Sequence, residues 1–235
     1  MKPKILILDI ETKPALAYVW GLFDQNVGLS QLVTPSAPIC VAAKYVGEPV
    51  CYFYSDWTDG HLEMIKAIHK LISEADAVVG YNSDGFDLRK LNGEFLLAGL
   101  PPVPPVTSID LLKTVRKLGF QSGKLAYIGP LLGIGGKVKN AGFELWLKVM
   151  EGDKVAQMKM KRYNIGDIKL TERLYKKLLP FIGNHPHLGA VGHECGACGS
   201  DNVQSRGYRR TKYFKIQRIQ CQKCGSWQSG KRTKV

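Results

Sequence analysis

Acidic residues stand in three short segments of the chain where they could hold divalent metal ions. Asp9 and Glu11 lie at the end of one apolar run, and Asp87 follows a second. Asp167 comes four residues after Tyr163. A buried carboxylate without a partner costs several kcal/mol or more, so acids at the ends of buried strands need cationic compensation. We expect a pair of divalent metal ions to supply that compensation.

The spacing within each segment places its acids on one face. Side chains alternate along a strand, so Asp9 and Glu11 point to the same side. Tyr163 and Asp167 are four residues apart and share one face of a helix. Each segment also has a structural explanation when it is taken alone, because acids commonly end strands and cap turns or helices. The combination of the three segments is harder to explain in that way.

In their order and separation the three segments resemble the motifs of the DEDD 3'-5' exonucleases of the ribonuclease H-like superfamily, over roughly residues 4 to 180. Tyr163 matches the tyrosine subgroup, because the histidine subgroup would carry its histidine at position 162, which is arginine. In the second segment Phe86-Asp87 matches the motif, whereas the competing Asp84 lies in the turn. The resemblance implies an α/β fold, a ribonuclease H-like mixed sheet flanked by helices, and a metal-dependent 3'-5' exonuclease.

The resemblance also implies a role for each site residue in a two-metal hydrolysis of phosphodiester bonds. Asp9 would bridge two Mg²⁺ or Mn²⁺ ions, and Glu11 and Asp167 would complete the ion on the side of the nucleophile. Asp87 would support the other ion through water. Tyr163 would orient the attacking water, because a phenol with a pKa near ~10 is a poor free base.

The elements that must position these acids follow from hydrophobic periodicity. Buried strands are predicted at 4–10 and 77–81, with a hairpin of 39–46 and 49–55 and a short strand at 106–109. Ser108 or Asp110 is a plausible cap for the helix after that short strand. Helices are predicted at 60–75, 87–97 and about 154–179, the last of them kinked or divided and ended by Pro180.

Two stretches resist such assignment. Residues 12–38 carry Trp20 and Phe23, which could stack on a terminal base, although aromatic side chains more often pack into a core. Three glycines in four residues interrupt the helical pattern at 132–137 and predict a flexible break. Lys124 and Lys137 could approach phosphates, but isolated lysines are usually solvated.

Four cysteines near the C-terminus form two C-x2-C pairs with 22 residues between them. This spacing predicts one structural zinc ion held by Cys195, Cys198, Cys221 and Cys224. The segment is too short to fold on an apolar core alone, so the metal would hold it together. Cys40 and Cys51 lie in predicted strands and are expected to be buried thiols.

Between the two cysteine pairs, basic residues alternate with aromatic ones. This combination attracts the phosphate backbone and stacks bases, which suits single-stranded nucleic acid and free 3' ends. The residues predicted to bind nucleic acid are Arg206, Tyr208, Arg209, Arg210, Lys212, Tyr213 and Lys215. The net charge agrees, since residues 193–235 hold 10 of the 33 Lys/Arg and 2 of the 20 Asp/Glu of a chain whose total charge is +13.

Length and composition predict three parts: a ribonuclease H-like domain at 1–182, a linker at 183–192 and a zinc ribbon at 193–235. With 45% apolar residues, the chain can build an ordinary packed core. No apolar run reaches the ~18 residues of a membrane span, and no signal peptide is visible at the start. We therefore expect a soluble, cytoplasmic protein without membrane contact. The zinc module and compact size are typical of bacterial or phage-encoded nucleases.

Two other functions remain open from the sequence. One is a catalytically silent nucleic-acid-binding protein with the same fold, although such a protein has no chemical need for all four acids. The other is a structure-selective endonuclease or a ribonuclease with the same chemistry. A replication or repair protein that delivers the substrate would be compatible with each of them.

Overall fold

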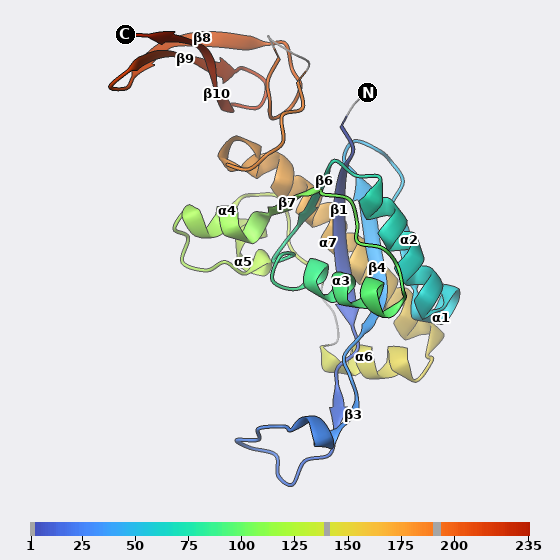
Figure 1. The fold of residues 1–235 in the computed structure, drawn as a ribbon. Coiled ribbons are helices and arrows are strands. Elements are labelled where there is room, and N and C mark those ends of the chain that lie inside the picture. Colours follow the sequence, from blue (N-terminus) through green and yellow to red (C-terminus); the bar gives the residue numbers. More distant parts are fainter. Residues whose placement is uncertain (1–2, 139–141, 190–193) are drawn as a thin grey trace.

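The computed structural model describes residues 3–138, 142–189 and 194–235 (Figure 1). A five-stranded sheet lies at its centre, with the strand order β5-β4-β1-β6-β7. The strands are β1 (Ile5–Thr12), β4 (Pro38–Tyr45), β5 (Tyr52–Ser55), β6 (Ala77–Gly80) and β7 (Thr107–Asp110). β1 pairs antiparallel with β4 and parallel with β6, so the sheet is mixed, as predicted.

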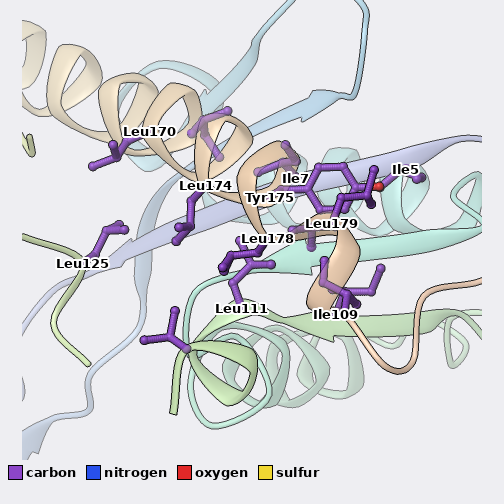
Figure 2. Close-up of a cluster of buried hydrophobic side chains, with 14 of the residues drawn as sticks. Ile5, Ile7, Ile109, Leu111, Leu125, Leu170, Leu174, Tyr175, Leu178 and Leu179 are labelled. Carbon is purple, nitrogen blue, oxygen red and sulfur yellow. The ribbon is translucent and has the colours of Figure 1, made fainter. Parts of the chain in front are cut away.

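Helices cover both faces of this sheet because β1 is apolar on both sides. Leu6 and Leu8 pack with buried residues of α2 (His61–Ser73) and α3 (Asp87–Leu97). Ile5 and Ile7 point to the opposite side, where the cluster shown in Figure 2 contains residues of three helices. Those helices are α4 (Leu111–Lys117), α5 (Leu125–Leu131) and α7 (Lys154–Leu178). The predicted α/β class, with a mixed sheet flanked by helices, is confirmed.

Two shorter helices complete the body. α6 (Phe143–Met150) packs its buried Leu145 and Val149 against α7 and β4, and α1 (Asp56–Asp59) follows β5 directly. Asp110 caps α4, since its side chain accepts a hydrogen bond from the backbone of Leu112. α7 is one continuous helix of 25 residues, so the expected division is wrong. The helix passes into a short 3-10 turn, η2 (Leu179–Phe181).

The unassigned stretch after β1 forms an arm that extends away from the body (Figure 1). It consists of the paired strands β2 (Leu16–Ala17) and β3 (Leu32–Thr34), with a 3-10 turn, η1 (Leu29–Gln31), between them. Trp20 is 99% exposed and Phe23 is 84% exposed. The interpretation that these two aromatic side chains pack into a core is therefore wrong.

The C-terminal segment forms a separate three-stranded antiparallel sheet at the far end of α7 (Figure 1). Its strands are β8 (Val203–Arg210), β9 (Phe214–Cys221) and β10 (Trp227–Lys234), with β9 in the middle. Part of the predicted linker, residues 190–192, lies outside the described residues. No helix in the described part of the chain is long and apolar enough to cross a membrane.

Candidate functional site

Three of the predicted acids meet at one point. Oxygen atoms of Asp9, Glu11 and Asp167, here called the acidic cluster, all lie within 4.8 Å of one another. Asp9 and Glu11 come from the same face of β1, and Asp167 comes from α7, which packs against β1 and β4. Buried positions on α7 recur at 160, 164, 167, 168 and 171, which places Asp167 on the stripe that faces the sheet.

Asp87 lies next to this cluster rather than inside it. It is the first residue of α3, it is buried, and its Oδ1 accepts a hydrogen bond of 3.0 Å from the backbone N–H of Ile10. Ile10 stands between Asp9 and Glu11 in β1. The charge of Asp87 contributes to the raised pKa of Asp9, after burial, which is the main cause. The structure therefore brings all four predicted acids to one end of β1.

Asp84, the competing acid of the second segment, is directed elsewhere. It forms an ion pair of 2.6 Å with Lys113 and accepts a hydrogen bond from Ser108. Burial alone would raise the pKa of Asp84, but the hydrogen bonds from Lys113 and Ser108 outweigh this effect. The pKa therefore lies below its usual value, and the carboxylate is already compensated. Asp84 needs no metal ion, whereas the acidic cluster has too few cations for its charge.

A lysine from the glycine-rich break reaches the acidic cluster. The ammonium of Lys137 lies 2.7 Å from Oδ2 of Asp167 and donates a hydrogen bond of 3.2 Å to Oη of Tyr163. Gly133 and Gly135 adopt positive φ angles, which lets the chain turn back toward α7. The expectation that Lys137 is merely solvated is therefore wrong. For Lys124 the same expectation agrees with the structure, because this side chain is exposed.

Three acids of the site, Asp9, Glu11 and Asp87, have raised pKa values, and burial is the main cause for each of them. Burial, then the charge of Asp167, raises the pKa of Glu11 to about 7. Burial raises the pKa of Asp87 to about 6, although the hydrogen bond from Ile10 opposes the shift. For Tyr163, burial and the charge of Asp167 also raise the pKa. A cation among these groups would favour their charged forms.

One buried atom indicates where such a cation fits. Oδ1 of Asp167 is buried and has no hydrogen-bond partner among the described residues. Most buried polar atoms in proteins have a partner, so an oxygen without one beside two other carboxylates is a natural metal ligand. The donor set consists of hard oxygen atoms, which suits Mg²⁺ or Mn²⁺ better than a soft metal.

Asn164 is a site residue that the sequence did not single out. Its side-chain amide donates hydrogen bonds to Oδ2 of Asp9 at 2.6 Å and to the backbone oxygen of Asp9 at 3.3 Å. Asn164 is fully buried. Its place three residues before Asp167 on a helix could have indicated a shared face. Cys40 contacts the other side of the same amide and is the buried thiol that was predicted, whereas Cys51 is only partly buried.

The four C-terminal cysteines form a second candidate metal site. Their sulfur atoms all lie within 4.8 Å of one another, with Cys195 3.6 Å from Cys224 and Cys198 3.7 Å from Cys221. Four thiolates around one zinc ion at ~2.3 Å would be separated by ~3.8 Å, so the observed spacing fits a tetrahedral zinc site. All four cysteines are free of disulfides.

The basic and aromatic residues between the cysteine pairs occupy β8, the following turn and the start of β9. Most of these side chains are exposed, as nucleic-acid contacts require. Two of the aromatic rings already have a cation of this chain over them. Lys215 lies 4.2 Å from the ring centre of Tyr208, and Lys212 lies 5.4 Å from that of Tyr213.

A family model and one solved structure agree with this architecture. The family model described as RNase_H superfamily matches residues 6–179. A family B DNA polymerase from the archaeon Pyrobaculum calidifontis is similar in fold, with a TM-score of 0.58 and 19% identity over 76% of this chain and 25% of the polymerase chain. RNase D from Trypanosoma brucei gives a TM-score of 0.47 at 14% identity, over 77% of this chain and 58% of that one. The comparison with curated proteins gave no match.

Proposed function

The chain belongs to the RNase H superfamily, and we propose that within it this protein is a metal-dependent 3'-5' exonuclease of the DEDD type, in the tyrosine subgroup. The substrate would be a nucleic acid with a single-stranded 3' end. One observation carries the proposal: three carboxylates meet within 4.8 Å, and a buried oxygen of Asp167 has no partner among the described residues.

The carboxylates are the residues that would hold the metal ions. Asp9, Glu11 and Asp167 are close enough to share one ion, and Asp87, which accepts a hydrogen bond from the backbone of Ile10 beside them, would support a second ion through water. Divalent ions in such a site stabilise charge on the attacking and leaving oxygens of a phosphodiester. Asn164 keeps Asp9 in place through its two hydrogen bonds.

Tyr163 and Lys137 are the groups of this chain that face the reacting phosphate in the proposal. Tyr163 has a raised pKa, so it keeps its proton near neutral pH and would donate a hydrogen bond to the attacking water rather than act as a base. We propose that the role of Tyr163 is to orient the attacking water. Lys137 contacts both Tyr163 and Asp167 and supplies positive charge at the same point.

The C-terminal sheet would bring the substrate to this site. We propose that residues 193–235 form a zinc ribbon and that residues 1–182 form the catalytic domain, joined by the linker. The ribbon, with 10 Lys/Arg and 2 Asp/Glu, carries most of the basic excess of the chain, and phosphate attraction of this kind is independent of sequence. Its predicted contacts are Arg206, Tyr208, Arg209, Arg210, Lys212, Tyr213 and Lys215.

A cleavage assay tests the proposal. Single-stranded DNA and RNA with a 5' label are incubated with the protein and Mg²⁺ or Mn²⁺, and the products are separated by length. A ladder that shortens from the 3' end supports an exonuclease. Internal fragments of defined length would instead indicate an endonuclease, and bound but intact substrate would indicate a silent binding protein.

Substitutions in the same assay assign the activity to the acidic cluster. Asp9→Asn and Asp167→Asn should each lower the rate by about 10³-fold or more, because each removes a metal ligand. Asp84→Asn is the matched control, since Asp84 is an aspartate compensated by Lys113 and lies outside the cluster. Its rate should stay within about twofold of the unsubstituted protein. Cleavage that survives in both cluster variants would refute the site.

A further inference from the structure

The two faces of the C-terminal sheet differ in chemistry. Residues paired across neighbouring strands point to the same side, and residues two apart on one strand do so as well. Ile216 pairs with Arg209 and with Arg232, Arg218 pairs with Ser229, and Gln220 pairs with Trp227. These residues share the face here called the tryptophan face. The opposite face carries Tyr208, Arg210, Lys215 and Gln217.

The tryptophan face is hollowed at one point. A concavity of about 350 Å³ is lined by Arg209, Arg218, Trp227, Gln228 and Ser229. Trp227 is 55% exposed, although it has the largest apolar side chain of this sheet and the sheet has few buried residues to form a core. Ligand sites of this kind begin at ~300 Å³, which is room for a single small unit rather than a folded segment.

Within the described parts of the chain, the two arginines that line the hollow, Arg209 and Arg218, form no salt bridge. The whole segment 193–235 holds only two acidic residues, Glu194 and Asp201. Two guanidinium groups beside one hollow therefore favour an external anion, and guanidinium is well suited to phosphate.

The indole of Trp227 is also free to stack. Among the aromatic rings of this sheet in the described residues, Tyr208, Tyr213 and Phe214 each have a cation over them, and the guanidinium of Arg232 lies 3.4 Å from the ring centre of Phe214. No such contact reaches Trp227 among these residues. A ring that is exposed and uncovered beside two arginines can accept a flat ligand.

We propose that this hollow binds one unpaired nucleotide of a nucleic acid strand, with its base stacked on Trp227 and its flanking phosphates held by Arg209 and Arg218. The proposal rests on the proposed function in one respect, that the substrate is a nucleic acid. It names a face of the sheet and adds Trp227 and Arg218 to the predicted contacts. An acidic peptide would satisfy the arginines but has no flat ring system for the indole, so nucleic acid is the better occupant.

Binding is measured by fluorescence anisotropy on the full chain with its zinc retained, without Mg²⁺ or Mn²⁺, so that the strand is not cut. The probes are fluorescein-labelled oligomers of dT and of U, a DNA duplex, and an acidic peptide. Trp227→Ala should weaken binding of a single strand by about 5- to 150-fold, the range found when one base loses its stacking partner. Trp227→Phe should recover most of this loss because it keeps a ring.

Three further variants distinguish binding in the hollow from general electrostatic attraction. Arg218→Ala should weaken binding and lower the salt dependence by about one phosphate contact, a slope change of ~0.7 for a single strand. Arg116→Ala, at the end of α4, removes an exposed arginine from the body and should leave affinity within about twofold. Tyr208→Ala should cost less than Trp227→Ala, since Lys215 already covers that ring.

Several results would overturn the proposal. Unchanged affinity in Trp227→Ala, with normal zinc content and circular dichroism, would do so. So would a loss in Tyr208→Ala as large as in Trp227→Ala, or equal affinity for the duplex or the acidic peptide. The proposed nuclease function fails separately, because it depends on cleavage in Mn²⁺. A protein that needs Trp227 for binding but never cuts would keep this inference and lose the other.

Discussion

At the scale of single residues, Lys137 occupies the position that a cation must take in the acidic cluster. Its ammonium pairs with Oδ2 of Asp167, and the other oxygen of that carboxylate, Oδ1, is the one proposed to hold a metal ion. The hydrogen bond and charge of Asp167 raise the pKa of Lys137 although burial opposes this, so Lys137 is positively charged throughout the neutral range. A metal ion on Oδ1 would share this carboxylate with Lys137, so we expect the two cations to compete for Asp167.

We therefore predict that Lys137→Ala binds Mn²⁺ about fivefold more tightly than the unsubstituted protein. A partly exposed ion pair contributes up to ~1 kcal/mol, and that free energy no longer opposes the metal. Titration calorimetry gives the affinity directly. Lys124→Ala is the control, since Lys124 is exposed and outside the cluster, and an equal change there or a weaker affinity in Lys137→Ala would contradict the competition.

The raised pKa of Glu11 predicts how stability changes with pH without Mg²⁺ or Mn²⁺. Burial and the charge of Asp167 raise this pKa from 4.5 to about 7, so between these values the folded state binds more protons than the unfolded state. The free energy of unfolding must then fall as pH rises from ~4.5 to ~7.

Thermal unfolding between pH 5 and 7.5 measures this effect. The melting temperature of the unsubstituted protein should fall more steeply than that of Glu11→Gln, which carries no titrating group at this position. Added Mn²⁺ should reduce the difference. Parallel curves for the two proteins would show that Glu11 titrates normally.

The acids could be predicted from the sequence because motif order and strand or helix periodicity are local properties. A strand end and one face of a helix indicated Asp9, Glu11 and Asp167, whereas Asp87 was preferred to Asp84 because of the resemblance to a family motif. The contact of Lys137 with the acidic cluster was not predicted, because it joins a glycine-rich loop to a helix residue about 30 positions away and no local pattern encodes that approach. Trp227 has no periodic signal either, since its environment depends on strand pairing.

At the scale of elements, α5 and the loop that carries Lys137 touch through Gly129. A Cβ on Gly129 would lie 2.3 Å from the backbone oxygen of Gly135, closer than any real contact. Alanine is favoured over glycine in a helix by ~1 kcal/mol, but the backbone of the loop would have to move. A Cβ before Pro130 is also disfavoured in helical conformation.

We predict that Gly129→Ala destabilises the protein by about 1–3 kcal/mol, the usual cost of overfilling a packed contact. Gly93→Ala is the matched control in α3, because an added Cβ there meets nothing within 4 Å. It should stabilise by about 0.5–1 kcal/mol. Urea unfolding compares the two, and a stabilised Gly129→Ala would mean that the loop is not packed against α5.

Most elements of the body were predictable because their apolar residues repeat with the period of a strand or helix. The predicted helix 87–97 matches α3 in full. The arm at 12–38 was not predictable, because exposed apolar residues such as Trp20 have no core that fixes their period. The continuity of α7 was missed because residues such as Gly166 lower helix propensity, whereas packing against the sheet holds the helix together.

At the scale of the whole molecule, the body and the C-terminal sheet differ in what stabilises them. Both faces of the central sheet have large apolar clusters. Among the described residues beyond 193, the buried apolar ones are only Cys195, Ile216 and Cys221. So small a core cannot stabilise a three-stranded sheet by itself. We infer that a bound zinc ion stabilises it.

Zinc removal should therefore unfold the C-terminal sheet and leave the body folded. Releasing the metal with a thiol-reactive mercurial should free about one zinc ion per chain. Trypsin should then cut rapidly within 206–234, where lysines and arginines are dense, while a fragment ending near the linker resists. Protection of the sheet after complete zinc release would contradict the inferred role of the metal.

The most direct test of the central claim is anomalous diffraction from crystals of this protein soaked in Mn²⁺. We expect a manganese peak within ~2.5 Å of carboxylate oxygens from Asp9, Glu11 and Asp167, with the Lys137 ammonium moved away from Asp167. This expectation would be contradicted if manganese bound elsewhere while Lys137 kept its contact with Asp167.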